Sequence, residues 1–447
     1  MMPCGDWNRV HAGAAQRAPP APPLSIIAYG VAVFIIGATA FTRVYYLNYA
    51  VQAFGAFLAF VYLLYTLQAR AYLSMEVFFY AAFVAWGVTG AFAALSPELF
   101  RSRLITVFQI WVLMVIVCGQ TSGRRELSFS LLALLVGVAI VGAASILSGS
   151  YREAEEGARR LTGLGQDVNY FGVLMIFATI VLMYFWVIPG RLGRVKYLLL
   201  GVPMVLATMA CILSGSRGSV AGMGVLYLLW IWFCFRKTML RQGRVLLAVM
   251  LVLAIGGYAF VSYAARAGVG QRFERTWESV RGGRVEGSTR TRLEMYRIGL
   301  DLILRSPLVG VGLGNFILHT PGYKVAHSDW TEVSATTGLP GAVAYFAIYA
   351  VLWVRAGRIR RDGSDPVAAS VAGLTRAVVL TVLFLGLGGP YYASKEGWIL
   401  LGSLIGYTNV VWQGLRSRAA AGPVSGVMAG RRSLPPARLP AGGGCST

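Results

Sequence analysis

The chain contains few charged residues and very few histidines. Asp, Glu, Lys and Arg make up 13% of its 447 residues, whereas soluble globular domains carry roughly 25%. Its three histidines do not form a His-Glu-x-x-His pair, which argues against a zinc site. The five cysteines are scattered at spacings that indicate neither a disulfide framework nor a metal site. We therefore expect a protein without a bound metal ion.

Hydrophobic residues make up 57% of the chain. They form repeated apolar runs of the length that a bilayer-spanning helix needs, about 20 residues, whereas β-barrel strands are far shorter and alternate in polarity. We predict an all-α fold, a polytopic transmembrane helical bundle of about 12 spans. The predicted spans are residues 24–42, 46–66, 75–95, 103–119, 127–147, 169–188, 196–213, 218–235, 244–263, 337–354, 368–387 and 396–414.

The net charge of +22 raises the question of a nucleic-acid partner. The basic residues, however, lie in the gaps between apolar runs and do not gather in one patch, so we expect no nucleic acid and a lipid bilayer instead. Lys and Arg concentrate in alternate short gaps, counted from the N-terminus. Because cytoplasmic loops carry this excess, both termini are predicted to be cytoplasmic.

The spans and gaps divide the chain into five parts. A cytoplasmic tail, 1–23, precedes spans one to nine in 24–263. A large extracytoplasmic loop, 264–336, separates these from spans ten to twelve in 337–414. The last part, 415–447, is rich in Ala, Gly, Pro and Arg and is predicted to be a disordered cytoplasmic tail.

The first candidate binding motif is SGSRGS, residues 214–219, at the outer end of the seventh predicted span. Gly218 allows a ligand to approach the backbone, and Ser216 lies where the free N–H groups of the next helix favour an anion. The guanidinium of Arg217 can bind phosphate in two-pronged fashion. The alternative is that Arg217 only anchors the helix at the membrane surface.

The second motif lies in the long outer loop, where helical spacing predicts a helix over about 289–305, ending before Pro307. Arg290 and Arg297 are seven residues apart and share one face of that helix, while Arg292 lies on another side near Tyr296. A positive outer loop attracts an anionic headgroup or diphosphate. The alternative is a solvated charged face.

The third motif is VAHSDWTEVSATTGLPG, residues 325–341. His327 titrates near neutrality and can exchange a proton with a substrate. Glu332 is its candidate partner, but the two would lie about 140° apart on a continuous helix, so contact requires a bend. Asp329 has no assigned role, and the alternative for His327 is a loop histidine without function.

The fourth motif, GLGQDVNYFG at 163–172, leads into the sixth predicted span. Asp167 and Asn169 at this entrance are typical of helix caps. A role for Asn169 in presenting sugar hydroxyls is a second interpretation.

In their order along the chain, these four segments resemble the O-antigen ligase and polymerase family of bacterial envelope glycosyltransferases. The resemblance covers roughly 163–345, and it departs from the family at Tyr296, where the family often has Trp, and at His327-Ser328, where it often has His-Asn. It is carried by Asp167, Asn169, Ser214, Ser216, Arg217, Gly218, Arg292, Tyr296, Arg297, the segment PLVGVGLGNF (307–316), His327, Glu332, Gly338 and Gly341.

The resemblance implies a multi-pass protein of the bacterial inner membrane with its active site facing the periplasm. It implies a polyprenyl-diphosphate-linked glycan donor, and as acceptor a lipid A core sugar, a protein hydroxyl or another lipid-linked glycan. No nucleotide sugar, metal or other cofactor is needed, and direct displacement would invert the anomeric centre.

The implied roles follow the motifs. Arg217 and Arg292 bind the diphosphate, with Arg297 or Arg290 as substitutes. His327 is the base on the acceptor side, with Glu332 orienting it or acting as the base itself. Asn169, Ser216 and Tyr296 lie near the substrate.

The sequence does not distinguish a ligase from a repeat-unit polymerase. A cell-wall glycan polymerase of the shape-and-division type relies on an external aspartate, whereas the motif here is centred on histidine and arginine. A transporter or lipid-glycan flippase would carry charged residues within its spans. Here those are few, chiefly Arg376 and Glu76.

Overall fold

The computed structural model describes residues 26–41, 45–69, 74–149, 151–153, 159–162, 167–189, 195–235 and 287–420. The predicted N-terminal tail, the predicted span 244–263 and the first part of the long loop lie outside these ranges. The same is true of the predicted tail beyond residue 420. Residues 415–420, which were assigned to that tail, are helical, so the prediction was wrong for them.

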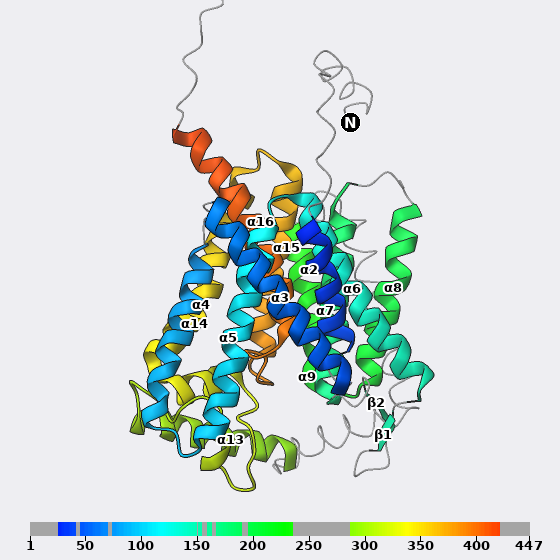
Figure 1. Ribbon diagram of the computed structural model, residues 1–447. Coiled ribbons are helices and arrows are strands. Elements are labelled where there is room, and N and C mark those ends of the chain that lie inside the picture. The colour runs from blue at the N-terminus through cyan, green and yellow to red at the C-terminus, as the bar shows by residue number, and fades with distance from the viewer. Residues whose placement is uncertain are drawn as a thin grey trace, which may run out of the picture.

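The described part of the chain is a bundle of long helices, as the apolar runs predict (Figure 1). Its one departure from the all-α prediction is a short antiparallel hairpin of β1 (Tyr151–Glu153) and β2 (Arg159–Leu161). The helices are α2 (Ile26–Ala40), α3 (Tyr45–Ala69), α4 (Met75–Thr89), α5 (Pro97–Gln120), α6 (Arg124–Leu147), α7 (Val168–Val187), α8 (Val195–Leu213), α9 (Arg217–Trp230), α13 (Gly287–Arg305), α14 (Asp329–Asp362), α15 (Pro366–Leu385) and α16 (Lys395–Ala420). Short helical turns are η2 (Gly90–Phe92), η3 (Ile231–Phe235) and η4 (Phe316–His319).

Among the described residues, eight helical segments are long and apolar enough to cross a membrane, and Ala28–Ala40 and Leu47–Tyr62 are shorter apolar helices. Every predicted span other than 244–263 coincides with a helix of the bundle. The total of about 12 spans stays a prediction.

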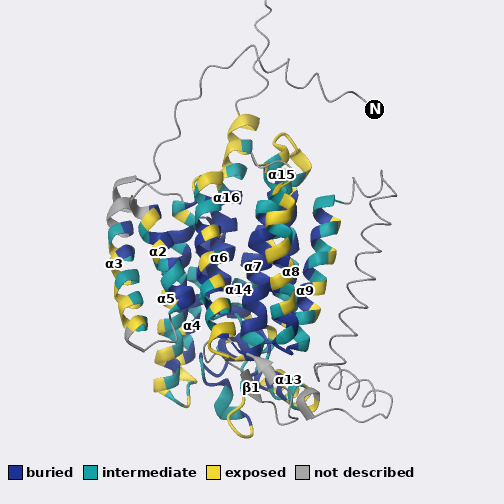
Figure 2. Ribbon diagram, turned by 90° about the vertical axis from the view of Figure 1, so that its right-hand side faces the viewer, coloured by how far each residue is buried: buried dark blue, intermediate teal, exposed yellow. Residues whose placement is uncertain are grey.

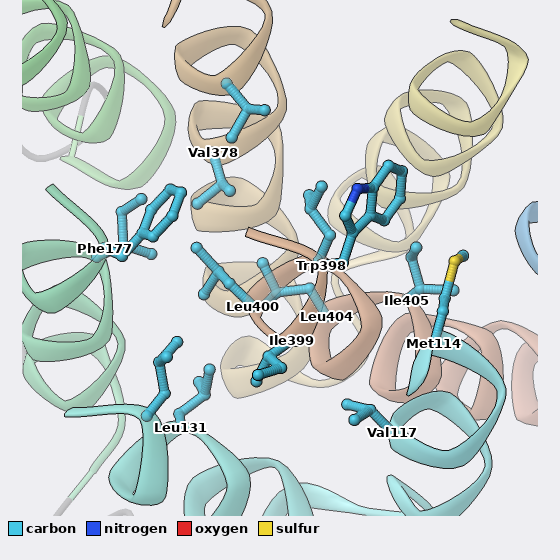
Figure 3. Close-up of a cluster of buried hydrophobic side chains, with 14 of the residues drawn as sticks. Met114, Val117, Leu131, Phe177, Val378, Trp398, Ile399, Leu400, Leu404 and Ile405 are labelled. Carbon is cyan, nitrogen blue, oxygen red and sulfur yellow. The ribbon is translucent and has the colours of Figure 1, made fainter. Parts of the chain in front are cut away.

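Helix α7 occupies the centre of the bundle and is dark blue along most of its length in Figure 2. Its apolar window is 78% buried, so this helix faces other helices and not lipid. Figure 3 shows Phe177 of α7 and Leu131 of α6 beside side chains of α16, among them Trp398. Burial of these apolar side chains fixes the positions of α7, which carries a residue of the site described below, and of α16, which directly follows the loop that forms one wall of that site.

One end of the bundle carries α13 and the β1–β2 hairpin, and we call it the α13 end (Figure 1). The first turn of α2 and the last turn of α16 lie at the opposite end (Figure 1). The segments predicted to be extracytoplasmic therefore gather at a single end wherever the structure describes them.

Helix α14 begins at Asp329, eight residues before the predicted span start at 337, and is kinked at Gly338. Gly338 has φ 69° and ψ 179°, which interrupts the helix. A Cβ on Gly338 would lie 2.2 Å from the carbonyl oxygen of Leu308, and the next amide, that of Leu339, donates to the carbonyl of Pro307 at 2.7 Å. The short segment before the kink thus packs against the 306–316 loop, and the long segment after it crosses the bundle.

Replacing Gly338 with alanine is expected to destabilise the protein by about 2–3 kcal/mol, since a positive φ with a steric clash costs of this order. The measurement is the thermal unfolding midpoint of the purified protein in detergent. The matched control is Gly224→Ala, because Gly224 is an exposed helical residue whose added Cβ would meet nothing within 4 Å. Equal midpoints for the two variants would contradict this account of the kink.

Candidate active site

A cavity of about 240 Å³, which we call the Arg292 cavity, brings together four of the residues that the sequence singled out, Gly218 and the three that follow. Asn169 comes from the first turn of α7, Ser216 from the α8–α9 turn, and Arg292 from α13. These residues are far apart in sequence, so the shared cavity is a result of the tertiary fold. The remaining lining residues are Phe384, Leu385, Leu387, Gly388 and Tyr391.

The α8–α9 turn presents the N-terminus of α9 to this cavity. Ser216 is the N-cap, and its Oγ accepts from the amide of Ser219 at 3.3 Å. Ser219 Oγ in turn donates to the carbonyl of Asn169 at 3.1 Å, which fixes the turn against the first turn of α7. Arg217 is half-buried and is the first residue of α9, between the lining residues Ser216 and Gly218. The free amides and positive dipole end of α9 suit an anion here.

Asp167 is the N-cap of α7, as its position predicts. Its side chain accepts from the amide of Asn169 at 2.8 Å. The same cap therefore holds the cavity residue Asn169 in place.

Of the three arginines on helix α13 that the sequence analysis proposed for diphosphate binding, only Arg292 lines the cavity. Arg292 and Tyr296 are half-buried, whereas Arg290 and Arg297 are exposed. The hydroxyl of Tyr296 donates to the carbonyl of Leu387, which itself lines the cavity. The two helix faces expected from the spacing are confirmed, and the inward face is the one that carries Arg292 and Tyr296.

His327 lies just before α14 and is half-buried, with a left-handed backbone at φ 55°. Burial lowers its pKa below the ordinary value, and the positive charges of Arg292 and Lys324 lower it further, while Asp167 acts in the opposite sense. The electrostatic environment of His327 is therefore set by groups of α13, of its own loop and of the α7 cap. The imidazole is mainly neutral near pH 7, so it can accept a proton.

Asp329, for which the sequence offered no role, is a buried anchor. Its backbone amide donates to the carbonyl of Gly386 at 2.8 Å. Its side chain accepts from the amide of Tyr392 at 2.8 Å and from the hydroxyl of Tyr345 at 3.3 Å. Asp329 thereby joins the start of α14 to the loop between α15 and α16, which forms one wall of the Arg292 cavity.

Glu332 is also buried, and its contacts differ from those expected. Its Oε1 accepts from the hydroxyl of Tyr392 at 3.1 Å. The guanidinium carbon of Arg103 lies 5.6 Å from the centroid of the Tyr392 ring. No hydrogen bond joins Glu332 to His327 among the residues that the structure describes. The pair is separated because His327 precedes the helix and Glu332 lies within its first turns.

The loop 386–394 between α15 and α16 is the part of the site that sequence reasoning missed. Leu387, Gly388 and Tyr391 line the cavity, yet the segment GLGGPYYAS reads only as a turn between two spans. Within the described ranges, no group of three or more His, Cys, Asp or Glu residues could hold a metal ion. The metal-free expectation stays a prediction.

Replacing Asp329 with alanine is expected to lower the free energy of unfolding by about 2–4 kcal/mol. The change leaves the buried amide of Tyr392 without its acceptor, at about 1–3 kcal/mol, and removes one hydrogen bond of the Tyr345 hydroxyl, at about 0.5–1.5 kcal/mol, since that hydroxyl keeps its contact with Tyr349 at 3.0 Å. The measurement is the denaturation midpoint in detergent.

Asp301→Ala is the matched control for this variant. Asp301 forms an exposed ion pair with Arg305 at 2.8 Å, and such pairs contribute at most about 1 kcal/mol. If Asp329→Ala were no less stable than Asp301→Ala, Asp329 would not be the anchor of the loop.

Comparison with known proteins finds a match to a family model and similar solved structures. Residues 202–346 match the family model of O-antigen ligases. That range includes every site candidate of the sequence analysis except Asn169, and it confirms the resemblance there. No curated protein matches the chain. A solved structure described as a peptidoglycan synthase complex aligns with a TM-score of 0.43 and 18% identity, covering 78% of this chain and 98% of that one.

Proposed function

Because residues 202–346 match the O-antigen ligase family, we propose that the chain is a glycosyltransferase of bacterial envelope polysaccharide synthesis. In this proposal it transfers an oligo- or polysaccharide from a polyprenyl-diphosphate donor to an acceptor at the α13 end of the bundle. The acceptor is a lipid A core sugar or a protein hydroxyl. Repeat-unit polymerisation is the second candidate, because it uses the same donor and the same chemistry.

The observation that carries the proposal is the composition of the Arg292 cavity. A guanidinium, the N-terminus of α9 at Ser216 and Gly218, and the Asn169 side chain line one space of about 240 Å³. Cationic and N–H donors in one place suit a diphosphate, whereas the amide and hydroxyl of Asn169 and Ser216 suit sugar hydroxyls. A site for a neutral apolar ligand would need neither the guanidinium nor the helix N-terminus.

The diphosphate in this proposal is bound by Arg292 together with Arg217 at the start of α9. Fixed positive groups aimed at a charge that develops during the reaction form a large part of catalysis. Two arginines supply that charge without a metal ion. The exposed Arg290 and Arg297 attract the donor to this end of the bundle, or take over part of the binding.

His327 is the proposed base for the acceptor. An imidazole nitrogen takes the proton of the acceptor hydroxyl as its oxygen attacks the anomeric carbon. The bond from that carbon to the diphosphate oxygen breaks, and the electron pair leaves with the polyprenyl diphosphate. A single displacement of this kind inverts the anomeric centre.

Glu332 has two possible roles in the proposal, as the orienting partner of His327 or as the base itself. Its hydrogen bond from Tyr392 favours an indirect role, in which it positions the 386–394 loop. Tyr296 has an indirect role of the same kind, because its hydroxyl donates to the carbonyl of Leu387 and so fixes α13 to the 386–394 loop.

The proposed location is the bacterial inner membrane, with the α13 end facing the periplasm and both termini in the cytoplasm. The opposite end carries basic residues in the last turns of α14 and α16, which agrees with the excess of positive charge in cytoplasmic segments. These residues are Arg358, Arg360, Arg361, Arg416 and Arg418.

Deletion of the coding sequence, followed by gels of surface polysaccharide and lipid-linked glycan, tests the proposed function. A ligase deletion leaves polymer on the lipid carrier and none on the acceptor. A polymerase deletion leaves single repeat units on the acceptor. A carrier-linked glycan that stays on the cytoplasmic face would contradict both readings and indicate a flippase.

A further inference from the structure

A second cavity lies between α2, α3 and α5, with a volume of about 280 Å³. Its wall is almost entirely hydrocarbon, from residues such as Phe34, Leu58 and Leu113. The polar residues that reach it are Gln52, Gln109 and Lys395. None of the residues of the Arg292 cavity lines it, so it is a separate site.

Lys395 is the one cation that lines this cavity. The ion pairs found among the described residues join Arg305 to Asp301 and Arg355 to Glu76, and neither includes Lys395. A lysine in an apolar wall within a membrane is costly unless an anion accompanies it.

The acidic neighbour of Lys395 in the chain is occupied elsewhere. The carboxylate of Glu396 accepts from the hydroxyl of Tyr170 and from Ser394 Oγ. The charge of Glu396 still acts on Lys395, but no ion pair holds the ammonium among the described residues, so it can meet an anion that enters the cavity.

The contact between Tyr170 and Glu396 also indicates where Lys395 lies along the axis of the bundle. Tyr170 is the third residue of α7, so Lys395 lies level with the first turn of α7 at the α13 end. The cavity wall includes α5 residues from Phe108 to Ile116, which run away from the α13 end. Eight residues of helix rise about 12 Å, against roughly 15 Å for half of a bilayer hydrocarbon core. The apolar wall is therefore about as long as one leaflet is thick, and Lys395 lies level with the first turn of α7.

We propose that this cavity binds an anionic glycerophospholipid of the leaflet at the α13 end, with its phosphate on Lys395 and one acyl chain between α3 and α5. One ammonium matches one phosphate, whereas the diphosphate of the proposed donor has its arginines in the other cavity. The wall is as long as one leaflet, which fits an acyl chain and is short for a polyprenyl tail. Exposed positions on α3, such as Ala56, leave a lateral path from the bilayer.

Native mass spectrometry of the purified full-length protein tests this proposal independently of glycan transfer. The protein in detergent is titrated with phosphatidylglycerol, with a diacylglycerol of the same chains, and with polyprenyl phosphate. Phosphatidylglycerol is expected to be retained about tenfold better than diacylglycerol, because only the phosphate can form a charge-assisted contact with the ammonium of Lys395.

Variants separate the phosphate contact from the acyl-chain contact. Lys395→Gln is expected to abolish the preference for phosphatidylglycerol and Lys395→Arg to keep it. Ala56→Trp, which fills the cavity without a change of charge, is expected to lower retention of both lipids. The matched control is Arg101→Gln, which removes an exposed positive charge from the first turns of α5 at the same end.

Three results would overturn the proposal. The first is retention of phosphatidylglycerol that is unchanged in Lys395→Gln. The second is a loss of the preference in Arg101→Gln equal to that in Lys395→Gln. The third is preferential retention of polyprenyl phosphate, which would assign the cavity to the donor.

Discussion

Replacing Arg292 with glutamine is expected to lower the rate of glycan transfer by about 10²–10³-fold, the usual effect of removing one fixed donor from a developing negative charge. Arg292 is the single arginine of α13 that lines the cavity, and the Nη1 atom lies 4.0 Å from the position of a Cβ built on Gly388. Arg292→Lys keeps the charge but not the planar fork, so we expect it to recover only part of the rate. The measurement is transfer from a lipid-linked donor in membranes with equal amounts of each variant.

Arg290→Gln and Arg297→Gln are the matched controls for this prediction. Each removes one positive charge from the same helix, but both side chains are exposed. A decrease of less than about threefold is expected, as for a change in a screened surface charge. Equal losses for Arg290, Arg292 and Arg297 would mean that the whole face attracts the donor and that the cavity has no special part in transfer.

Replacing His327 with glutamine is expected to lower the transfer rate by about 10²–10⁴-fold, the usual contribution of a general base. The matched control is His319→Gln, since His319 lies in the same outer segment, but the charges of Arg292 and Asp167 act on the pKa of His327 and not on that of His319. Equal rates for the wild type and His327→Gln would remove the histidine from the chemistry and leave Glu332 as the candidate base.

The pH profile supplies a second test of the same residue. Burial, Arg292 and Lys324 lower the pKa of His327 below its ordinary value of 6.5. The base must be neutral to act, so activity should persist as pH falls to 6.5 and be lost only below that value. Lys324→Gln removes one of the lowering charges and is expected to move this acid limb to higher pH, with little loss of maximum rate.

Arg297→Gln serves as the control for this shift, because Arg297 is not among the groups that act on the His327 pKa. An acid limb that stays in place in Lys324→Gln would show that a different group titrates.

Much of the fold follows from the sequence because a membrane span is a local pattern. Length and apolarity of a run determine the helix, and no distant contact is needed. The same holds for α13, where the spacing of Arg290, Arg292 and Tyr296 separates an outer from an inner face. The predicted helix over 289–305 agrees with α13 to within two residues.

The wall formed by the 386–394 loop could not be predicted in this way. The hydroxyl of Tyr296 bonds to Leu387, which is 91 residues away in sequence. Asp329 bonds to the amide of Tyr392, 63 residues away. These contacts depend on how α14, α15 and α16 pack, which no periodicity encodes. The buried role of Glu332 was missed for the same reason, since its partner Tyr392 is 60 residues away.

Reconstitution shows whether the protein itself transfers glycan from a lipid-linked donor to an acceptor. The purified protein is placed in liposomes with a polyprenyl-diphosphate-linked glycan and an acceptor, without metal ions, and the products are analysed by mass spectrometry. We expect a covalent glycan–acceptor product with an inverted anomeric centre and an equal amount of released polyprenyl diphosphate, with both products formed about 10²–10³-fold more slowly by Arg292→Gln. Transfer that proceeds equally well with Arg292→Gln, or donor that crosses the bilayer without forming a new glycosidic bond, would contradict this expectation.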